Sequence, residues 1–161
     1  MTHRFLALVF IATITFQCRQ KEVKGEFAFA KKEAPRRQKA SETINLVNKG
    51  VGPINSVVLN EEIDSEMAER GKQLYETKCL ACHKLGATFI GPPPNAILER
   101  RTPEWVMNMI LNPEGMLEKD SVAKALFMEF NGQIMTNQQL AENEARDILE
   151  YFRTLEPLKP L

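Results

Sequence analysis

One short motif restricts this chain more than any other feature of its sequence. Cys79, Leu80, Ala81, Cys82 and His83 form the pattern C-x-x-C-H. Two thiols separated by two residues occur in three kinds of site: half of a zinc site, a redox-active dithiol, and an attachment point for haem. Each kind needs different partners, so the rest of the sequence decides between them.

The remaining cysteine and histidine residues argue against zinc. A structural zinc site needs a second pair of ligands, but the only other histidine is His3 and the only other cysteine is Cys18. A thioredoxin-like dithiol belongs in a βαβ unit, whereas a helical pattern precedes Cys79. Thiols at this spacing can bind the two vinyl groups along one porphyrin edge and bring the histidine under the iron. We therefore predict one covalent haem c, attached through Cys79 and Cys82 and ligated by His83.

The first residues have the pattern of an export signal. His3 and Arg4 precede an apolar run over residues 5–16, which is shorter than the roughly 17 residues that a membrane-spanning helix requires. We predict a processed signal over residues 1–17, with an uncleaved short anchor as the alternative. The junction at Cys18 resembles a bacterial lipoprotein signal, which implies lipidation of Cys18 and a membrane anchor. With cleavage at another position, Cys18 would be lost or remain an ordinary thiol.

Charge divides the rest of the chain into a basic and an acidic part. Residues 19–60 contain nine Lys and Arg against four Asp and Glu, whereas residues 61–161 contain eleven against seventeen. We predict a basic arm over residues 18–60, flexible at first and ending in an extended strap over residues 44–59 whose role is unassigned. The basic charges are expected either to lie against anionic lipid or to form a solvated spacer. Residues 61–161 are the predicted haem domain, and no nucleic-acid-binding pattern is present.

Start and stop signals in the haem domain predict four helices. Asp64 is suited to cap the first helix, and Thr102 followed by Pro103 is suited to begin the second. Asn112 with Pro113 is expected to end that second helix. The fold class is therefore all-α, a small domain of about four helices around one haem. The predicted helices cover about residues 64–79, 102–112, 121–130 and 142–155.

The second axial ligand of the iron is predicted to be a methionine. Removal of His3 with the signal excludes a second histidine and leaves methionine, lysine, water or no ligand. Met135 lies in the loop 132–137 between the last two predicted helices, from which it can reach over the haem. Met116 is expected in another loop and is the competing candidate. Three further methionines fall within predicted helices and are interpreted as core residues: Met107, Met109 and Met128.

Further marks surround the C-x-x-C-H motif: Gly71, Tyr75, the Gly91-Pro92 step, Met135, and the run Ile148 to Phe152. Over about residues 70–155 they resemble the class I monohaem c-type cytochromes. The resemblance implies that the first and last helices cross at Gly71, with Tyr75, Ile148 and Tyr151 packed beside it. Two positions depart from the family pattern. Thr136 follows the methionine where proline is common, and Ala141 stands where a capping residue is expected.

The resemblance also implies polar contacts around the haem. The carbonyl of Pro92, or of a neighbouring residue, would accept the free ring N–H of His83, the alternative being a proline that only forms a turn. Trp105 would donate its indole N–H to a haem propionate, and Arg100 or Arg101 would pair with one. The alternatives are a core aromatic residue and a solvated pair of charges.

With both axial positions filled, no coordination site is left for a substrate, so we predict an electron-transfer protein and not an enzyme. Residues 91–95, 100–116 and 135–140 resemble the small cytochromes that accompany nitrous oxide reductase. This implies an exported, periplasmic, membrane-tethered carrier in denitrifying respiration, placed between a quinol-oxidising donor complex and a terminal reductase or oxidase. The alternative is a haem-based gas sensor or catalyst with a labile sixth ligand.

Overall fold

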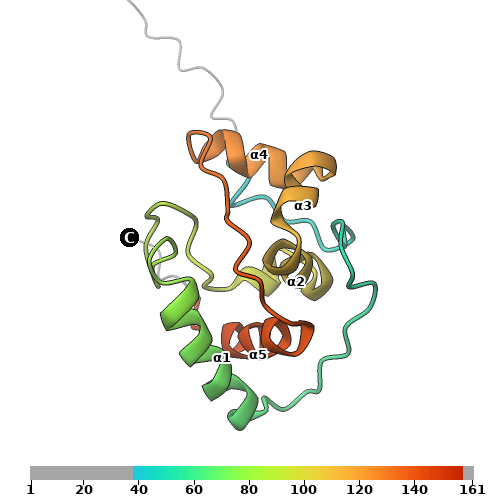
Figure 1. The fold of residues 1–161 in the computed structure, drawn as a ribbon, viewed down its shortest axis with the longest axis vertical. Helices are drawn as coiled ribbons and strands as arrows, with labels where there is room; N and C mark the ends of the chain where they lie inside the picture. Colours follow the sequence, from blue (N-terminus) through green and yellow to red (C-terminus); the bar gives the residue numbers. More distant parts are fainter. Residues whose placement is uncertain (1–37, 158–161) are drawn as a thin grey trace, which may run out of the picture. The chain divides into compact units, whose positions relative to one another are not determined.

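Five α-helices and one 3-10 helix form the regular structure of residues 38–157, the part of the chain that the computed structural model describes (Figure 1). Within these residues there is no β-strand, and no helix is long and apolar enough to cross a membrane. The predicted all-α class is confirmed. The predicted export signal, with Cys18 and the rest of the basic arm up to residue 37, lies outside the described residues. The elements are α1 (Ser65–Lys78), η1 (Ile97–Glu99), α2 (Pro103–Leu111), α3 (Pro113–Lys119), α4 (Ser121–Glu129) and α5 (Glu142–Arg153).

Side chains at the helix starts explain where the helices begin. Asp64, Thr102 and Asp120 each accept a backbone N–H from the first turn of α1, α2 and α4, at 2.9, 3.1 and 2.7 Å. Such caps satisfy N–H groups that have no partner inside the helix. Ala141 cannot cap α5, but the Glu144 carboxylate accepts the Ala141 N–H at 2.8 Å. The reciprocal half of a capping box thus compensates for the missing side chain.

Helix α3 was not predicted, and the interpretation of Met116 as a loop residue is wrong. Pro113 does end α2, but it also occupies the first position of α3. Proline suits that position because the N–H that it lacks would have no intrahelical partner. Met116 is completely buried in α3, and its sulfur accepts the backbone N–H of Val51 at 3.0 Å. It is therefore a core residue.

Helices α1 and α5 cross at Gly71, where their backbones are so close that no residue larger than glycine would fit. A Cβ atom on Gly71 would lie 1.9 Å from the carbonyl oxygen of Asp147. Beside this contact, the ring centroid of Tyr75 lies 5.5 Å from that of Tyr151 and 5.7 Å from that of Phe152. The glycine lets the backbones meet, and the three aromatic rings fill the space next to the crossing.

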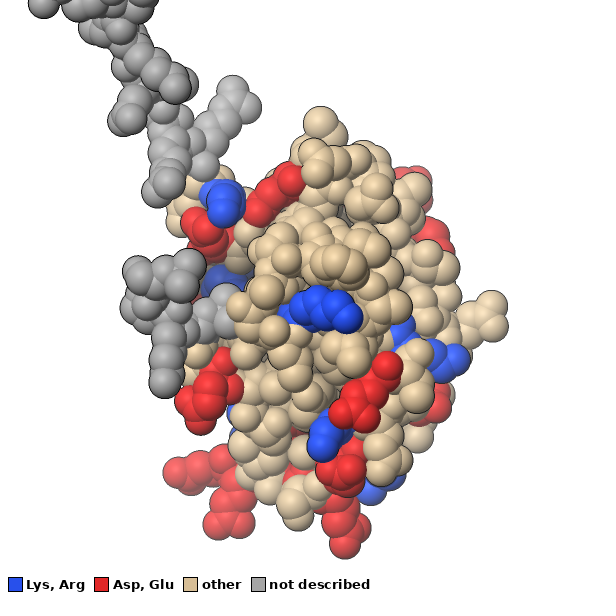
Figure 2. Space-filling view, turned by 90° about the vertical axis from the view of Figure 1, so that its left-hand side faces the viewer, with Lys and Arg blue, Asp and Glu red and all other residues tan. Residues whose placement is uncertain are grey.

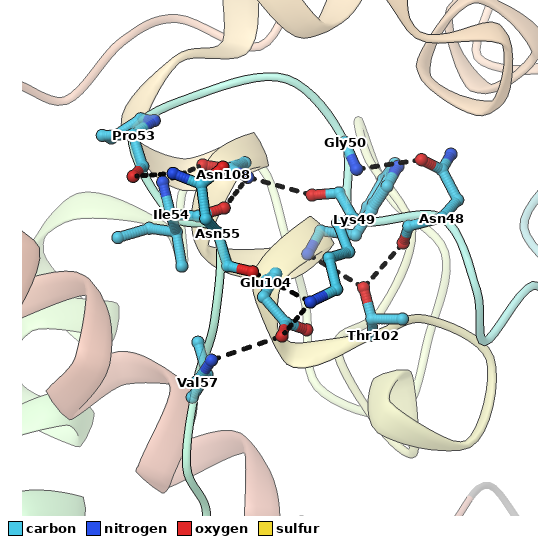
Figure 3. A network of polar contacts seen from close by, with 11 residues as sticks. Asn48, Lys49, Gly50, Pro53, Ile54, Asn55, Val57, Thr102, Glu104 and Asn108 are labelled. Carbon is cyan, nitrogen blue, oxygen red and sulfur yellow. Dashed lines mark hydrogen bonds and ion pairs between the residues drawn. The ribbon is translucent and has the colours of Figure 1, made fainter.

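The strap, residues 44–59, runs without regular structure along α2 and α3 (Figures 1 and 3). The side chain of Asn108 in α2 is 1% exposed and binds the strap backbone three times. Its amide nitrogen donates to the carbonyl oxygens of Lys49 at 2.9 Å and Ile54 at 2.8 Å. Its oxygen accepts the N–H of Ile54 at 2.9 Å. The buried Asn108 side chain thus satisfies both the backbone N–H and the carbonyl oxygen of Ile54.

Other polar side chains of α2 also depend on the strap (Figure 3). Thr102 donates to the carbonyl oxygen of Asn48 at 2.6 Å. Glu104 accepts the N–H of Val57 at 3.3 Å and pairs with Lys49 at 3.2 Å. Because Thr102 and Glu104 are buried, these groups would lack partners if the strap were absent. The strap therefore belongs to the packed structure of the domain.

Replacing Asn108 with Ala should lower the free energy of unfolding by about 2–4 kcal/mol, because three hydrogen bonds are lost and buried amide groups lose their partners. Asn55→Ala is the matched control, since Asn55 is exposed and its side chain makes one bond of 3.3 Å to Pro53. The control should change stability by less than about 0.5 kcal/mol. Urea unfolding of the holoprotein measures both. Equal effects would contradict a stabilising role for the strap.

Candidate haem site

The C-x-x-C-H motif forms a tight turn at the end of α1. The carbonyl oxygen of Tyr75 accepts the N–H groups of Cys79 and Leu80, both at 2.9 Å. The carbonyl oxygen of Cys79 accepts those of Cys82 at 3.0 Å and His83 at 2.9 Å. This turn places both cysteines and the histidine on the wall of one cavity.

Three contacts fix the orientation of His83. Its Nδ1 lies 2.8 Å from the carbonyl oxygen of Pro92, and its own carbonyl oxygen accepts the Tyr75 hydroxyl at 2.5 Å. A Cβ atom on Gly91 would lie 2.4 Å from His83 Cε1, so glycine is required beside the ring. Since a carbonyl oxygen only accepts, Nδ1 carries the proton in this contact and Nε2 is the nitrogen left to bind a metal.

The cavity beside His83 is enclosed by segments that are far apart in the sequence. The proline run after Gly91 forms one wall, and α2 forms another. The end of α4 and the loop that follows it complete the enclosure. The lining is largely apolar, which suits a flat hydrophobic macrocycle that is anchored by a few polar groups. Lining side chains from α2 and from the α4–α5 region include Trp105, Val106, Met109, Phe127, Phe130, Ile134 and Met135.

The structure separates the methionines by position. Among the described residues, Met109 and Met135 line the cavity. Met109 lies within α2, whereas Met135 lies on the loop between α4 and α5. Met107 is buried in the core, Met116 bonds to the strap, and Met128 is 74% exposed. Met116 is therefore no longer a candidate for the axial ligand, and Met135 remains the predicted one.

Two arginines, Arg100 half-buried and Arg101 buried, line the cavity with unused donors. The Nε atoms of Arg100 and Arg101 are buried and make no hydrogen bond, although their terminal nitrogens donate to backbone carbonyls, including that of Ala40 at 2.6 Å from Arg101. Burial lowers the pKa of both guanidinium groups. Anionic groups in the cavity would satisfy these donors and offset the buried charge. The residues present therefore fit a haem with its two propionates.

Trp105 does not have the role that was expected of it. Its only side-chain donor, the indole Nε1–H, already donates to Asp120 at 3.1 Å, so it is not free for a propionate. The indole ring instead forms part of the cavity wall, with the Arg101 guanidinium 5.2 Å from its centroid. Asp120, which the sequence analysis did not single out, also caps α4 and accepts the Asn48 side chain at 2.6 Å. It links the cavity wall to the strap.

Ser41 is a second residue that the sequence analysis missed. It lines the cavity, and its N–H and hydroxyl bind the carboxylate of Glu129 at 2.9 and 2.5 Å. Ser41 lies far before the motif, in a stretch without pattern, so no signal in the sequence could have identified it.

The thiol chemistry of the site argues against a redox-active dithiol. Burial, together with the nearby Cys82, raises the pKa of the Cys79 thiol to about 11. Reactive dithiols instead have a lowered pKa, which provides the nucleophilic thiolate near neutral pH. The raised pKa of Cys79 therefore disfavours thiol exchange at this site.

Comparisons with known proteins agree with the fold. A protein-family model described as "Cytochrome c" matches residues 68–156. The structure of a cytochrome c from Rhodothermus marinus is 46% identical, with a TM-score of 0.61, over 63% of this chain and 87% of that chain. An engineered cytochrome c from the same organism, bound to a carbene intermediate, is 44% identical, with a TM-score of 0.59, over 63% and 88% of the two chains. Among curated protein sequences no significant match was found.

Replacing Gly91 with Ala should push the His83 ring away from the Pro92 carbonyl, because the new Cβ would overlap the ring. We expect a loss of about 2 kcal/mol in unfolding free energy and an altered absorption spectrum of the haem. Gly86→Ala is the control. Nothing lies within 4 Å of its Cβ position, so only its φ of +75° adds strain, about 1 kcal/mol. An unchanged Gly91→Ala spectrum would contradict the role assigned to this glycine.

Proposed function

The chain belongs to the cytochrome c family, and from this membership we propose that it carries single electrons through one covalent haem c with His83 and Met135 as axial ligands. Cytochromes of this family hold their haem through a C-x-x-C-H motif, here Cys79 and Cys82. The observation that carries the proposal is the enclosed apolar cavity that is lined by the motif and by Met135. The haem supplies a one-electron couple between ferric and ferrous iron.

The protein residues would tune this couple and keep the site rigid. The Pro92 carbonyl at 2.8 Å from Nδ1 would hold the His83 ring and strengthen its donation to a metal. Met135, a soft thioether ligand, would favour the ferrous state and raise the reduction potential relative to two histidines. The apolar walls would keep water away, so that little has to rearrange when the charge of the site changes.

We propose in addition that the mature protein is exported and tethered to a membrane. The apolar run over residues 5–16 and the cysteine at position 18 support this, because together they resemble a lipoprotein signal. The basic arm after Cys18 would let the domain move away from the membrane surface. The mass of the mature protein distinguishes a lipidated Cys18 from cleavage at another position.

The narrower proposal is a place in denitrifying respiration. We propose a quinol-oxidising complex as the electron donor and nitrous oxide reductase as the acceptor, on the basis of the resemblance of residues 91–95, 100–116 and 135–140. Reduced protein mixed with nitrous oxide reductase should be reoxidised at a rate that rises with enzyme concentration, as absorbance of the reduced haem reports. A terminal oxidase is the control acceptor. Rapid reoxidation by the oxidase alone would overturn the nitrous oxide reductase assignment and leave the carrier function standing.

Carbon monoxide separates an electron carrier from the alternative, a gas sensor or catalyst with a labile sixth ligand. A relative with a bound carbene intermediate is an engineered protein, so the natural ligation of this chain has to be tested directly. We expect carbon monoxide to leave the spectrum of the reduced protein nearly unchanged, and Met135→Ala to make it respond strongly.

The same variant tests the ligand itself. The oxidised protein should show a methionine-to-iron charge-transfer band that Met135→Ala abolishes. Met109→Leu is the matched control, because Met109 also lines the cavity, and it should keep the band. Survival of the band in Met135→Ala would disprove the assignment of the sixth ligand.

A further inference from the structure

Among the described residues, the Lys, Arg, Asp and Glu side chains that line the cavity are all basic: Lys78, Arg100 and Arg101. Lys78 is exposed and Arg100 is half-buried, whereas Arg101 is 1% exposed. Water solvates an exposed lysine, but a buried guanidinium has to be held and balanced by the protein around it. The partners of Arg101 therefore decide where this charge lies at the cavity wall.

Backbone carbonyls that precede the strap hold the terminal nitrogens of Arg101. Its Nη2 donates to the carbonyl oxygen of Ala40 at 2.6 Å. Its Nη1 donates to the carbonyl oxygen of Thr43 and, at 2.8 Å, to that of Arg100. Nε is the donor left over, and it is buried without a partner in a side chain that lines the cavity. The guanidinium is thus held at its far end by backbone, with one N–H left for an acceptor in the cavity.

Residues 39–43, which we call the cover, form a turn that is fastened to the end of α4. The carbonyl oxygen of Lys39 accepts the N–H of Thr43 at 3.0 Å. Ser41, at the centre of the turn, lines the cavity and donates its N–H and its hydroxyl to the two carboxylate oxygens of Glu129, at 2.9 and 2.5 Å. In Figure 1 the start of the described chain, drawn in cyan, lies beside α4. We call the contact between Ser41 and Glu129 the clasp.

Two carboxylates behind the cavity wall act on the charge of Arg101. Burial lowers the pKa of its guanidinium, whereas Asp120 and Glu129 raise it. Neither carboxylate lines the cavity, and each is held from the segment before α1: Asp120 accepts the side chain of Asn48 at 2.6 Å, and Glu129 accepts Ser41. Figure 2 shows acidic and basic side chains close together at the upper left, beside the start of the described chain. The cover therefore lies where opposite charges meet.

We propose that Ser41 and Glu129 are positioning residues of the electron-transfer site: by clasping the cover to α4 they keep Arg101 against the cavity and so keep the reduction potential high. The proposal rests on the proposed electron-carrier function. A cation held beside the site stabilises the ferrous state, which has one positive charge fewer than the ferric state. A closed cover also keeps out water, which would favour the more highly charged ferric state. Both effects raise the potential, and both weaken when the clasp opens.

Potentiometric titration of the full-length holoprotein tests the clasp. Ser41→Ala removes the hydroxyl donor and leaves the charge of Glu129 in place, so opening of the cover sets the sign of the shift. We expect the equilibrium constant for reduction to fall at least two-fold, about 18 mV at 59 mV per ten-fold change for one electron. Ser41→Gly should repeat the fall, and Ser41→Thr, which keeps a hydroxyl, should restore the original potential. Ser56→Ala is the matched control, because Ser56 is an exposed strap residue that does not line the cavity.

A double-mutant cycle tests whether Ser41 acts through Glu129. Glu129→Ala removes a negative charge as well as the clasp, so its own shift combines two effects. Adding Ser41→Ala to Glu129→Ala should change the potential much less than Ser41→Ala does alone, because the contact is already broken. Equal shifts in the two backgrounds would show that Ser41 does not act through Glu129 and would overturn the clasp.

Hydrogen exchange observes the cover without using the redox couple. The N–H of Thr43 donates to Lys39, and that of Asn45 donates to the carbonyl oxygen of Arg100 at 2.9 Å. In the reduced holoprotein, NMR should show both amides exchanging at least ten-fold faster in Ser41→Ala than in Ser56→Ala. Urea unfolding shows whether each variant is folded.

The outcomes are distinguishable. Faster exchange with an unchanged potential would mean that the clasp only stabilises the fold, and unchanged exchange would mean that it does not hold the cover; either result overturns the proposal while the carrier function stands. If the unmodified protein showed no reversible one-electron couple, the carrier function would fall, and the positioning role with it.

Discussion

The close approach of α1 and α5 at Gly71 determines the rest of the structure. The C-x-x-C-H turn continues directly from the end of α1, and the loop with Met135 leads directly into α5. The helix contact therefore fixes both halves of the candidate site, although the two halves are more than fifty residues apart in the sequence. A Cβ atom at position 71 would lie 1.9 Å from the backbone of α5, and backbone cannot turn aside as the end of a long side chain can. The placement of His83 and Met135 in the candidate site thus depends on a helix contact that involves neither residue.

The wall that α2 contributes to the site is held in place in a different way. Helix α2 contributes Trp105 to the cavity, yet its opposite side carries buried polar groups that are satisfied by the strap. An unsatisfied buried polar group costs about 1–3 kcal/mol, so the hydrogen bonds to residues 44–59 help to position α2 in addition to its apolar packing. Those residues lie before the stretch that the family model matches, residues 68–156. This chain therefore uses a segment outside the family core to fix one wall of its cofactor site.

The sequence predicts features that depend on neighbouring residues better than features that depend on contacts between distant segments. Local signals were reliable: the caps at Asp64 and Thr102 are where the sequence indicated, because a cap needs only its own first turn. Helix α3 was missed because proline ends one helix and begins another with equal ease. The bond from the Trp105 indole to Asp120 could not be predicted, because it depends on how two helices meet. The same residue pattern would fit a tryptophan that donates to a propionate and one that packs in the core. The strap was left without a role because its contacts use mainly its backbone, which has no signature in the sequence.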